Sequence, residues 1–230
     1  MVQGARSGER RTSVDDIFNH LKEEILSLRL RPGDKISEAD IAAQFGVSRQ
    51  PVRDAFSRLA NLDLLLIRPQ RATEVRRFSS REIEKARFVR AAIEKEVLQR
   101  AAQFCDKNDA RRLNSAIADQ ERVTCKKDLT NFGQMDYDFH KILCEIARAD
   151  FAFDVIQTEK SKVDRLCRLG LSKEDRMPLL VADHRAIADA VIGHDPEKAI
   201  AIGMLHLSRL DETIEQISQS STTYFEQTDA

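Results

Sequence analysis

The chain has 230 residues, of which 42% are hydrophobic and 33% are charged. This composition can bury a core in one large domain or two smaller ones, and it excludes a chain that is disordered throughout. No apolar run approaches the roughly 20 residues of a membrane span, so we expect a cytoplasmic protein without a membrane partner. The four cysteines lie 20, 19 and 23 residues apart, which excludes a CxxC zinc pair and predicts reduced core residues.

The first predicted elements are an arm and a helix. Residues 1–12 are polar and are typical of a loose arm. From Ser13, an N-cap residue, apolar side chains recur at helical spacing as far as Leu28. We expect this helix to stop within residues 31–34, where a proline and a glycine follow one another.

Residues 37–59 predict a helix-turn-helix. Residues 37–40 form a capping box that opens a short helix, and Gly46 closes it. Ser48 is the predicted cap of the next helix, and Pro51 lies in its first turn, where a missing N–H costs nothing. Two short helices joined by a tight turn with a glycine are typical of a DNA-binding helix-turn-helix.

A wing and a helical bundle complete the predicted fold, which is mainly α. Residues 64–67 and 72–75 predict two strands joined by a turn, so that residues 13–78 form a winged helix-turn-helix domain. Residues 79–220 predict an all-α bundle of six or seven helices, and residues 221–230 a tail. The turns of the bundle are expected near residues 106–109, Gly133, Gly170 and residues 193–196.

The third predicted helix carries the side chains that a recognition helix needs in its first turns. Arg49 and Arg53 share one face, where an arginine can bind guanine or phosphate, and Gln50 can bind adenine. Ser48 at the cap completes this predicted DNA-binding set. At the wing tip, Arg68 and Arg71 are candidates for a phosphate or minor-groove contact.

Four residues of the helical part predict a metal site. Asp136 and His140 are four apart, so on a helix they point the same way and can bind one ion together, while His184 and His206 lie in two further helical stretches. One carboxylate and three imidazoles suit a divalent transition metal, zinc, nickel, manganese or iron, and leave a position for a ligand's oxygens. The alternative is that these histidines are only packed and hydrogen-bonded in the core.

Several motifs occur together in the N-terminal part: Pro32-Gly33, Ser37-Glu38, Ile41-Ala42, Gly46-Val47-Ser48-Arg49 and Pro51-Val52-Arg53-Asp54-Ala55. This combination resembles the winged helix of the GntR family of bacterial transcriptional regulators, most of which repress. The family usually has one glycine before the wing strands, where this chain has Asn61-Leu62-Asp63, and another at the wing tip, where this chain has Ala72. A Cβ at the tip is expected to hinder close approach to the minor groove.

The helical part resembles the FCD-type effector domain of the FadR branch of that family. The spacing of Asp136, His140 and the two later histidines is similar to its metal site, and Arg90-Ala91-Ala92-Ile93-Glu94 resembles an Arg-x-x-x-Glu element. The resemblance implies that the metal and nearby cationic groups receive a small carboxylate, such as a sugar acid or hydroxy acid. By that implication, Arg90 is the first candidate for contact with the effector carboxylate and Arg165 is the second.

We therefore expect a ligand-responsive repressor, and not an enzyme, that binds a pseudo-palindromic operator in double-stranded DNA as a homodimer. One alternative is a metal-dependent enzyme acting on a small organic acid, because three histidines, a carboxylate and an open position could activate water. No HExxH motif supports that alternative. A purely structural metal is a third hypothesis.

Overall fold

The computed structural model describes residues 13–174 and 176–226, and it divides into two compact units between Arg77 and Phe78. The predicted arm, residues 1–12, lies outside the described residues. Within the described part of the chain, no helix is both long enough and apolar enough to cross a bilayer.

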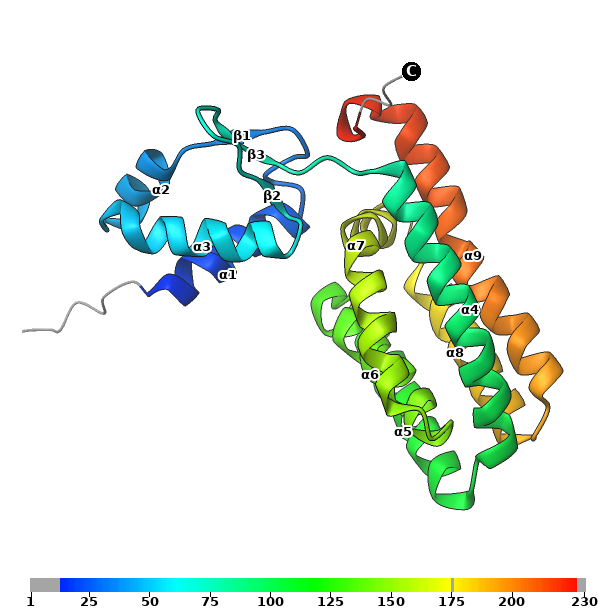
Figure 1. Cartoon of the computed structure of the whole chain (residues 1–230). Helices are drawn as coiled ribbons and strands as arrows, with labels where there is room; N and C mark the ends of the chain where they lie inside the picture. The colour runs from blue at the N-terminus through cyan, green and yellow to red at the C-terminus, as the bar shows by residue number, and fades with distance from the viewer. Residues whose placement is uncertain (1–12, 175, 227–230) are drawn as a thin grey trace, which may run out of the picture. The chain divides into compact units, whose positions relative to one another are not determined.

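The first unit combines helices with a small sheet (Figure 1). Its elements are α1 (Val14–Leu26), β1 (Lys35–Ile36), α2 (Glu38–Phe45), α3 (Arg49–Asn61), β2 (Leu65–Leu66) and β3 (Thr73–Val75). The strands form an antiparallel sheet in the order β1-β3-β2, and the pair β2-β3 is the predicted wing. The sequence pattern does not predict β1, because two residues carry no periodicity and the strand exists only through its pairing with β3.

Capping side chains set the ends of the first helices. Ser13 and Asp16 form a reciprocal capping box at the start of α1. The helix ends at Leu26, earlier than the predicted stop, because Ser27 caps it and Leu28 turns into the left-handed region with φ 59°.

The helix-turn-helix is closed by a serine and a glycine. The Ser37 side chain accepts hydrogen bonds from two backbone N–H groups of α2, and Gly46 ends this helix with φ 65°, a left-handed conformation that costs a glycine little. Ser48 stands at the N-cap position of α3, but its side chain makes no capping hydrogen bond. Ser48 therefore occupies the predicted cap position without forming the capping bond, and since Ser48 is exposed, solvent can satisfy the first N–H groups of α3.

The second unit is an all-α bundle, in agreement with the predicted fold class (Figure 1). Its described helices are α4 (Ser80–Phe104), α5 (Lys107–Cys125), α6 (Leu129–Ile146), α7 (Asp150–Glu174), α8 (Met177–Ile192) and α9 (Pro196–Ser220), followed by the 3-10 helix η1 (Thr222–Tyr224). The turns predicted at Gly133 and Gly170 are wrong, because both residues lie inside helices. A glycine costs a helix interior only about 1 kcal/mol, and buried neighbours such as Phe132 and Phe139 outweigh that cost.

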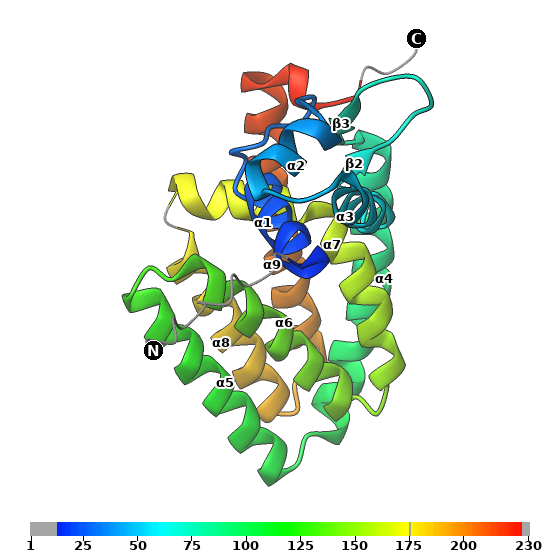
Figure 2. The same ribbon diagram turned by 90° about the vertical axis from the view of Figure 1, so that its left-hand side faces the viewer.

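The helices of this unit surround one main core. Helix α4 packs along both α7 and α9, and α5 packs along α6 and α8 (Figures 1 and 2). The largest fully buried side chains in this core are Leu113, Ile117, Phe132, Phe139 and Ile156.

The end of the chain and the cysteines differ from expectation. Residues 221–226 do not form a free tail, because Phe225 is buried and pairs with Phe78 in a parallel bridge. Cys105 and Cys144 are buried as predicted, whereas Cys125, the last residue of α5, is exposed. The side chain of Cys167 lies outside the described residues.

Candidate functional site

Four buried polar side chains meet in the centre of the bundle. Asp136 and His140 project from α6, His184 from α8 and His206 from α9. One ligand atom from each residue lies within 4.8 Å of those of the other three. The structure thus brings together all four residues that the sequence singled out as metal ligands.

The side chain of Gln120, on α5, determines which nitrogen of His184 carries the proton. Gln120 Nε2 donates a hydrogen bond to the Met135 carbonyl at 3.1 Å, so Gln120 Oε1 is the atom that faces His184 Nδ1, at 2.7 Å. An amide oxygen only accepts, so Nδ1 is protonated and Nε2 presents its lone pair to the cluster. Burial, followed by the charge of His206, lowers the pKa of His184 well below its usual value, which keeps the ring neutral.

Carboxylates stand behind the other two imidazoles. His140 Nδ1 lies 3.2 Å from Glu94 Oε2, and His206 Nδ1 lies 3.7 Å from Asp183 Oδ2, which is long for a hydrogen bond. At His140 this acceptor draws the Nδ1 proton away from the centre, as is usual for metal-binding histidines. His206 Nδ1 forms no hydrogen bond with a described residue. Burial alone would raise the pKa of Glu94, but Arg90 and His140 outweigh it and lower that pKa to about 2, so the carboxylate is ionised.

Acceptor atoms face one another in the middle of the cluster. His184 Nε2 presents its lone pair to Asp136 Oδ1, a second acceptor, at 3.4 Å. His206 Nε2 lies 3.3 Å from His184 Nε2, and its role as donor or acceptor follows from the tautomer of His206. Among the described residues, the buried His140 Nε2 has no hydrogen-bond partner. Lone pairs at such distances repel one another unless a cation lies between them. A separation of 3.3 Å is also close to that of two atoms that each lie about 2.1 Å from one metal ion, so the residues fit a divalent transition metal.

Lys160, on α7, holds the second oxygen of Asp136. Its Nζ lies 3.1 Å from Asp136 Oδ2 and 4.0 Å from the centroid of the Tyr137 ring. Burial would raise the pKa of Asp136, but Lys160 and the three histidines lower it, so this carboxylate is ionised. Because Lys160 occupies Oδ2, Asp136 presents one oxygen, Oδ1, to His184 and the centre.

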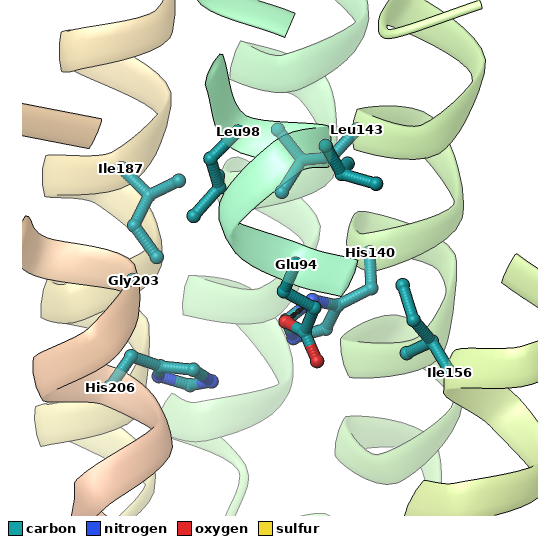
Figure 3. Close-up of a pocket in the computed structure, with 9 residues that line it drawn as sticks. Glu94, Leu98, His140, Leu143, Ile156, Ile187, Gly203 and His206 are labelled. Carbon is teal, nitrogen blue, oxygen red and sulfur yellow. Dashed lines mark ion pairs between the residues drawn. The ribbon is translucent and has the colours of Figure 1, made fainter. Parts of the chain in front are cut away.

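A small pocket adjoins the cluster (Figure 3). Glu94, His140 and His206 supply its polar part, and Figure 3 shows that they project from three different helices. Its other lining side chains are aliphatic: Val97, Leu98, Leu143, Ile156 and Ile187. Gly203 of α9 completes the wall, and a Cβ there would lie 2.2 Å from Leu98 Cδ1, so the glycine permits the close approach of α9 to α4.

The two arginines predicted to contact an effector do not line this pocket. Arg90 is buried, and its Nε donates a hydrogen bond to Glu94 Oε1 at 2.9 Å, so its charge compensates Glu94. Arg165 is also buried, and its guanidinium lies 4.6 Å from the centroid of the Phe78 ring. The pocket therefore presents the carboxylate of the Arg90–Glu94 pair, and not its guanidinium.

The first turns of α3 form an exposed polar face. Ser48, Arg49 and Gln50 are exposed, and Gln50 Nε2 donates a hydrogen bond to Asp54 Oδ1 at 3.0 Å. Arg53 is exposed as well, but its Nε and one terminal nitrogen contact the carboxylate of Glu38, on α2, at 3.4 and 3.1 Å. Arg53 therefore ties together the two helices of the helix-turn-helix.

The wing turn carries the other two predicted DNA contacts. Arg68 and Arg71 are exposed on the turn between β2 and β3, and Arg68 lies 3.2 Å from Glu74 Oε2. The left-handed residue of this turn is Gln70, with φ 57°, and not Ala72. The absence of a glycine at position 72 therefore does not strain the backbone of the wing.

Asp63 lies in the turn before the wing strands, where the family usually has a glycine and this chain has none. Its φ is 55°, a left-handed conformation that aspartate and asparagine adopt more readily than most other residues with a side chain. Its carboxylate lies 2.7 Å from a terminal nitrogen of Arg76. The turn before the wing thus keeps its shape without a glycine.

Comparison with known families agrees with this arrangement. Residues 13–75 match the family described as bacterial regulatory proteins, gntR family, and residues 86–209 match the FCD domain. The chain belongs to the GntR family. As a GntR regulator with an FCD domain, it is a DNA-binding transcriptional regulator and not an enzyme, and nothing in these matches supports the alternative of a metal-dependent enzyme.

Relatives of this GntR regulator share most of its length. The HTH-type transcriptional repressor RspR of Escherichia coli (strain K12) is 32% identical over 91% of this chain and 92% of its own length. A probable D-xylose utilization operon transcriptional repressor of Paenarthrobacter nicotinovorans is 29% identical over 83% of both chains. A putative GntR regulator from Rhodococcus sp. RHA1 has the same fold, with a TM-score of 0.68 at 20% identity over 88% of this chain and 97% of that chain.

Proposed function

We propose that this GntR regulator is a homodimeric repressor that responds to a small carboxylate. The effector binds at a divalent transition metal held by Asp136, His140, His184 and His206, and it changes the affinity for a pseudo-palindromic operator in the cytoplasm. The observation that carries the metal site is the pair of acceptors His184 Nε2 and Asp136 Oδ1, which face each other at 3.4 Å within the cluster. Relatives named as repressors support the direction of control.

Charge compensation around the cluster favours an anionic effector. The ionised side chains nearest the cluster form three ion pairs: Asp136 with Lys160, Glu94 with Arg90, and Asp183 with Arg209. Because these charges cancel, the two positive charges of a bound metal remain for a ligand. Nickel, manganese or iron with four protein ligands keeps open positions, which a carboxylate and a neighbouring hydroxyl can fill together.

The lining of the pocket favours a short aliphatic hydroxy acid over a sugar acid. Leu98, Leu143 and Ile156 offer no partner to a hydroxyl group, and a buried hydroxyl without a hydrogen bond costs free energy. Glu94 is ionised and lines the same pocket, so its carboxylate can accept a hydrogen bond from one hydroxyl group. One hydroxyl next to the carboxylate therefore matches the pocket better than a chain of hydroxyls.

On the DNA side, the exposed face of α3 makes the base contacts. We place Arg49 and Gln50 on base edges, because both are exposed in the first turn of the recognition helix. Ser48 and Arg53 flank them and contact phosphates, with Arg53 also held by Glu38. The wing pair, Arg68 and Arg71, contacts phosphates or the minor groove.

The DNA-binding proposal is tested on a site selected from random-sequence DNA with the full-length protein. Because one bidentate base contact is worth about 1–3 kcal/mol, Arg49→Ala should weaken binding to the selected site by about 5- to 150-fold and non-specific binding much less. Arg100→Ala removes another exposed arginine, which pairs with Glu96 on α4, and should leave both affinities unchanged. Unchanged affinity in Arg49→Ala contradicts the assignment of the recognition helix.

The effector proposal is tested by calorimetric titration of nickel-loaded protein with three acids. We expect 2-hydroxybutyrate to bind more tightly than butyrate, which lacks the hydroxyl, and more tightly than gluconate, which adds further hydroxyls. Chelation of the metal should abolish this binding. If the metal raises the melting temperature but none of the three acids binds, the metal is structural and the proposal of an effector at the metal is wrong.

A further inference from the structure

The described C-terminal residues bind the chain where the second unit begins. Residues 221–226 turn back through η1, and the Phe78 N–H donates a hydrogen bond to the Tyr224 carbonyl at 2.8 Å. The Glu226 N–H donates in turn to the Phe78 carbonyl, also at 2.8 Å. Both backbone polar groups of Phe78 are therefore satisfied by the C-terminal segment.

The side chains at this point form a core of their own. Phe78 is 2% exposed, its ring centroid lies 5.5 Å from that of Phe225, and Arg165 covers it at 4.6 Å. The other buried residues of this cluster come from three helices: Ile83 and Ala86 of α4, Val163 and Leu166 of α7, and Ile217 of α9. Arg165, which does not line the pocket, thus has a structural place in this second core.

The cluster around Phe78 lies where the chain passes from the DNA-binding unit into the helical unit. Phe78 is the first residue of the helical unit, and Arg77 is the last of the DNA-binding unit. The clasped segment follows directly on α9, the helix that carries His206. Helix α9 is continuous from Pro196 to Ser220, so a shift of the helix at His206 displaces its C-terminal end as well.

We propose that residues 221–226 act as a clasp that ties Phe78 to α9, and that this clasp carries changes at the metal site to the segment entering the DNA-binding unit. The coupling rests on the proposed function, whereas the clasp itself does not. The three contacts that make it are the two backbone hydrogen bonds of Phe78 and the tilted packing of its ring against that of Phe225.

Hydrogen exchange of the full-length protein tests the clasp. In Phe225→Ala, the amides in peptides covering Phe78 should exchange about tenfold faster or more, while those in the middle of α4 and α8 stay protected. Thr222→Ala changes an exposed residue of the same segment and should leave Phe78 protected. Protection of Phe78 that is unchanged in Phe225→Ala overturns the clasp.

The coupling is tested in the same experiment with and without zinc after chelator treatment. In the wild type, zinc should change exchange both in peptides covering His140 and in those covering Phe78. In Phe225→Ala, the response at His140 should remain and the response at Phe78 should disappear. A response at His140 without one at Phe78 in the wild type overturns the coupling. If zinc does not change exchange in the peptides covering His140, the proposed metal site is wrong. The clasp is then tested by comparing exchange at Phe78 between the zinc-free wild type and zinc-free Phe225→Ala.

Discussion

Two of the three imidazoles of the cluster, those of His184 and His140, depend on a residue that binds their other nitrogen. His184 relies on Gln120, His140 on Glu94, and these partners come from α5 and α4. Since they orient the rings and set their tautomers, they are expected to control metal affinity without touching the metal.

Replacement of Gln120 tests this dependence. Gln120→Met keeps the volume of the side chain but removes the acceptor for His184 Nδ1, so the affinity for zinc should fall by about 10- to 100-fold. Competition with a chelating dye measures this affinity. Gln134→Met, an exposed glutamine of α6, is the matched control. An unaltered affinity in Gln120→Met would show that the tautomer of His184 is set in another way.

The pKa of Glu94 predicts how stability depends on pH. It is about 2 in the folded protein and about 4.3 in an unfolded chain, so ionised Glu94 stabilises the fold above about pH 4.3. This contribution is lost as the pH falls towards 2. In metal-free protein, the free energy of unfolding should therefore decrease less steeply between pH 4.5 and 2.5 in Glu94→Gln than in the wild type. Urea unfolding at several pH values measures the slope, and Glu96→Gln, on the exposed face of α4, should keep that of the wild type.

The ligands could be predicted from the sequence, whereas their partners could not. Asp136 and His140 could be predicted as a ligand pair, because two residues four apart on one helix lie on the same face, and this spacing is visible in the sequence. Gln120 and Lys160 act on residues of other helices, so no spacing connects them with their partners. Asp183 stands next to His184 in the sequence but lies against His206 in the fold, which adjacency does not suggest.

At the scale of elements, Gly203 permits the close approach of α4 and α9 in the wall of the pocket. Gly203→Val should push against Leu98, cost about 1–3 kcal/mol of unfolding free energy and fill part of the pocket. Ala201→Val, on the exposed side of α9, should cost only a few tenths of a kcal/mol to about 0.7 kcal/mol through helix propensity. Thermal unfolding measures both variants. A smaller loss in Gly203→Val than in Ala201→Val contradicts the packing argument.

Element boundaries followed the sequence where a side chain marks them. Ser37 and Gly46 bound α2 as predicted, because a cap and a left-handed glycine act locally. The turns predicted at Gly133 and Gly170 were wrong, because packing within the bundle outweighs the small free-energy cost of a glycine in a helix. The pairing of Phe225 with Phe78 escaped prediction, since its two partners lie at opposite ends of the unit's sequence.

At the scale of the whole molecule, the DNA-binding face and the metal cluster belong to different units with separate cores. The four ligands of the metal cluster and their partners Glu94, Gln120 and Lys160 together come from all six described α-helices of the second unit, so metal occupancy affects the whole bundle. Removal of the metal should therefore lower the melting temperature of the helical unit and leave the core around Phe56 and Leu59 intact. Calorimetry of the full-length protein with and without chelator measures this, and an equal loss in both units would contradict their independence.

Native mass spectrometry of the full-length protein tests the central claim most directly. After chelation and reloading with zinc or nickel, the account predicts a dimer with one metal per chain, and an adduct of the mass of 2-hydroxybutyrate when that acid is added. His140→Ala should lose the metal, whereas His20→Ala, which removes an exposed histidine of α1, should keep it. A protein that carries no metal after reloading, or that binds equal amounts with and without His140, would contradict the account.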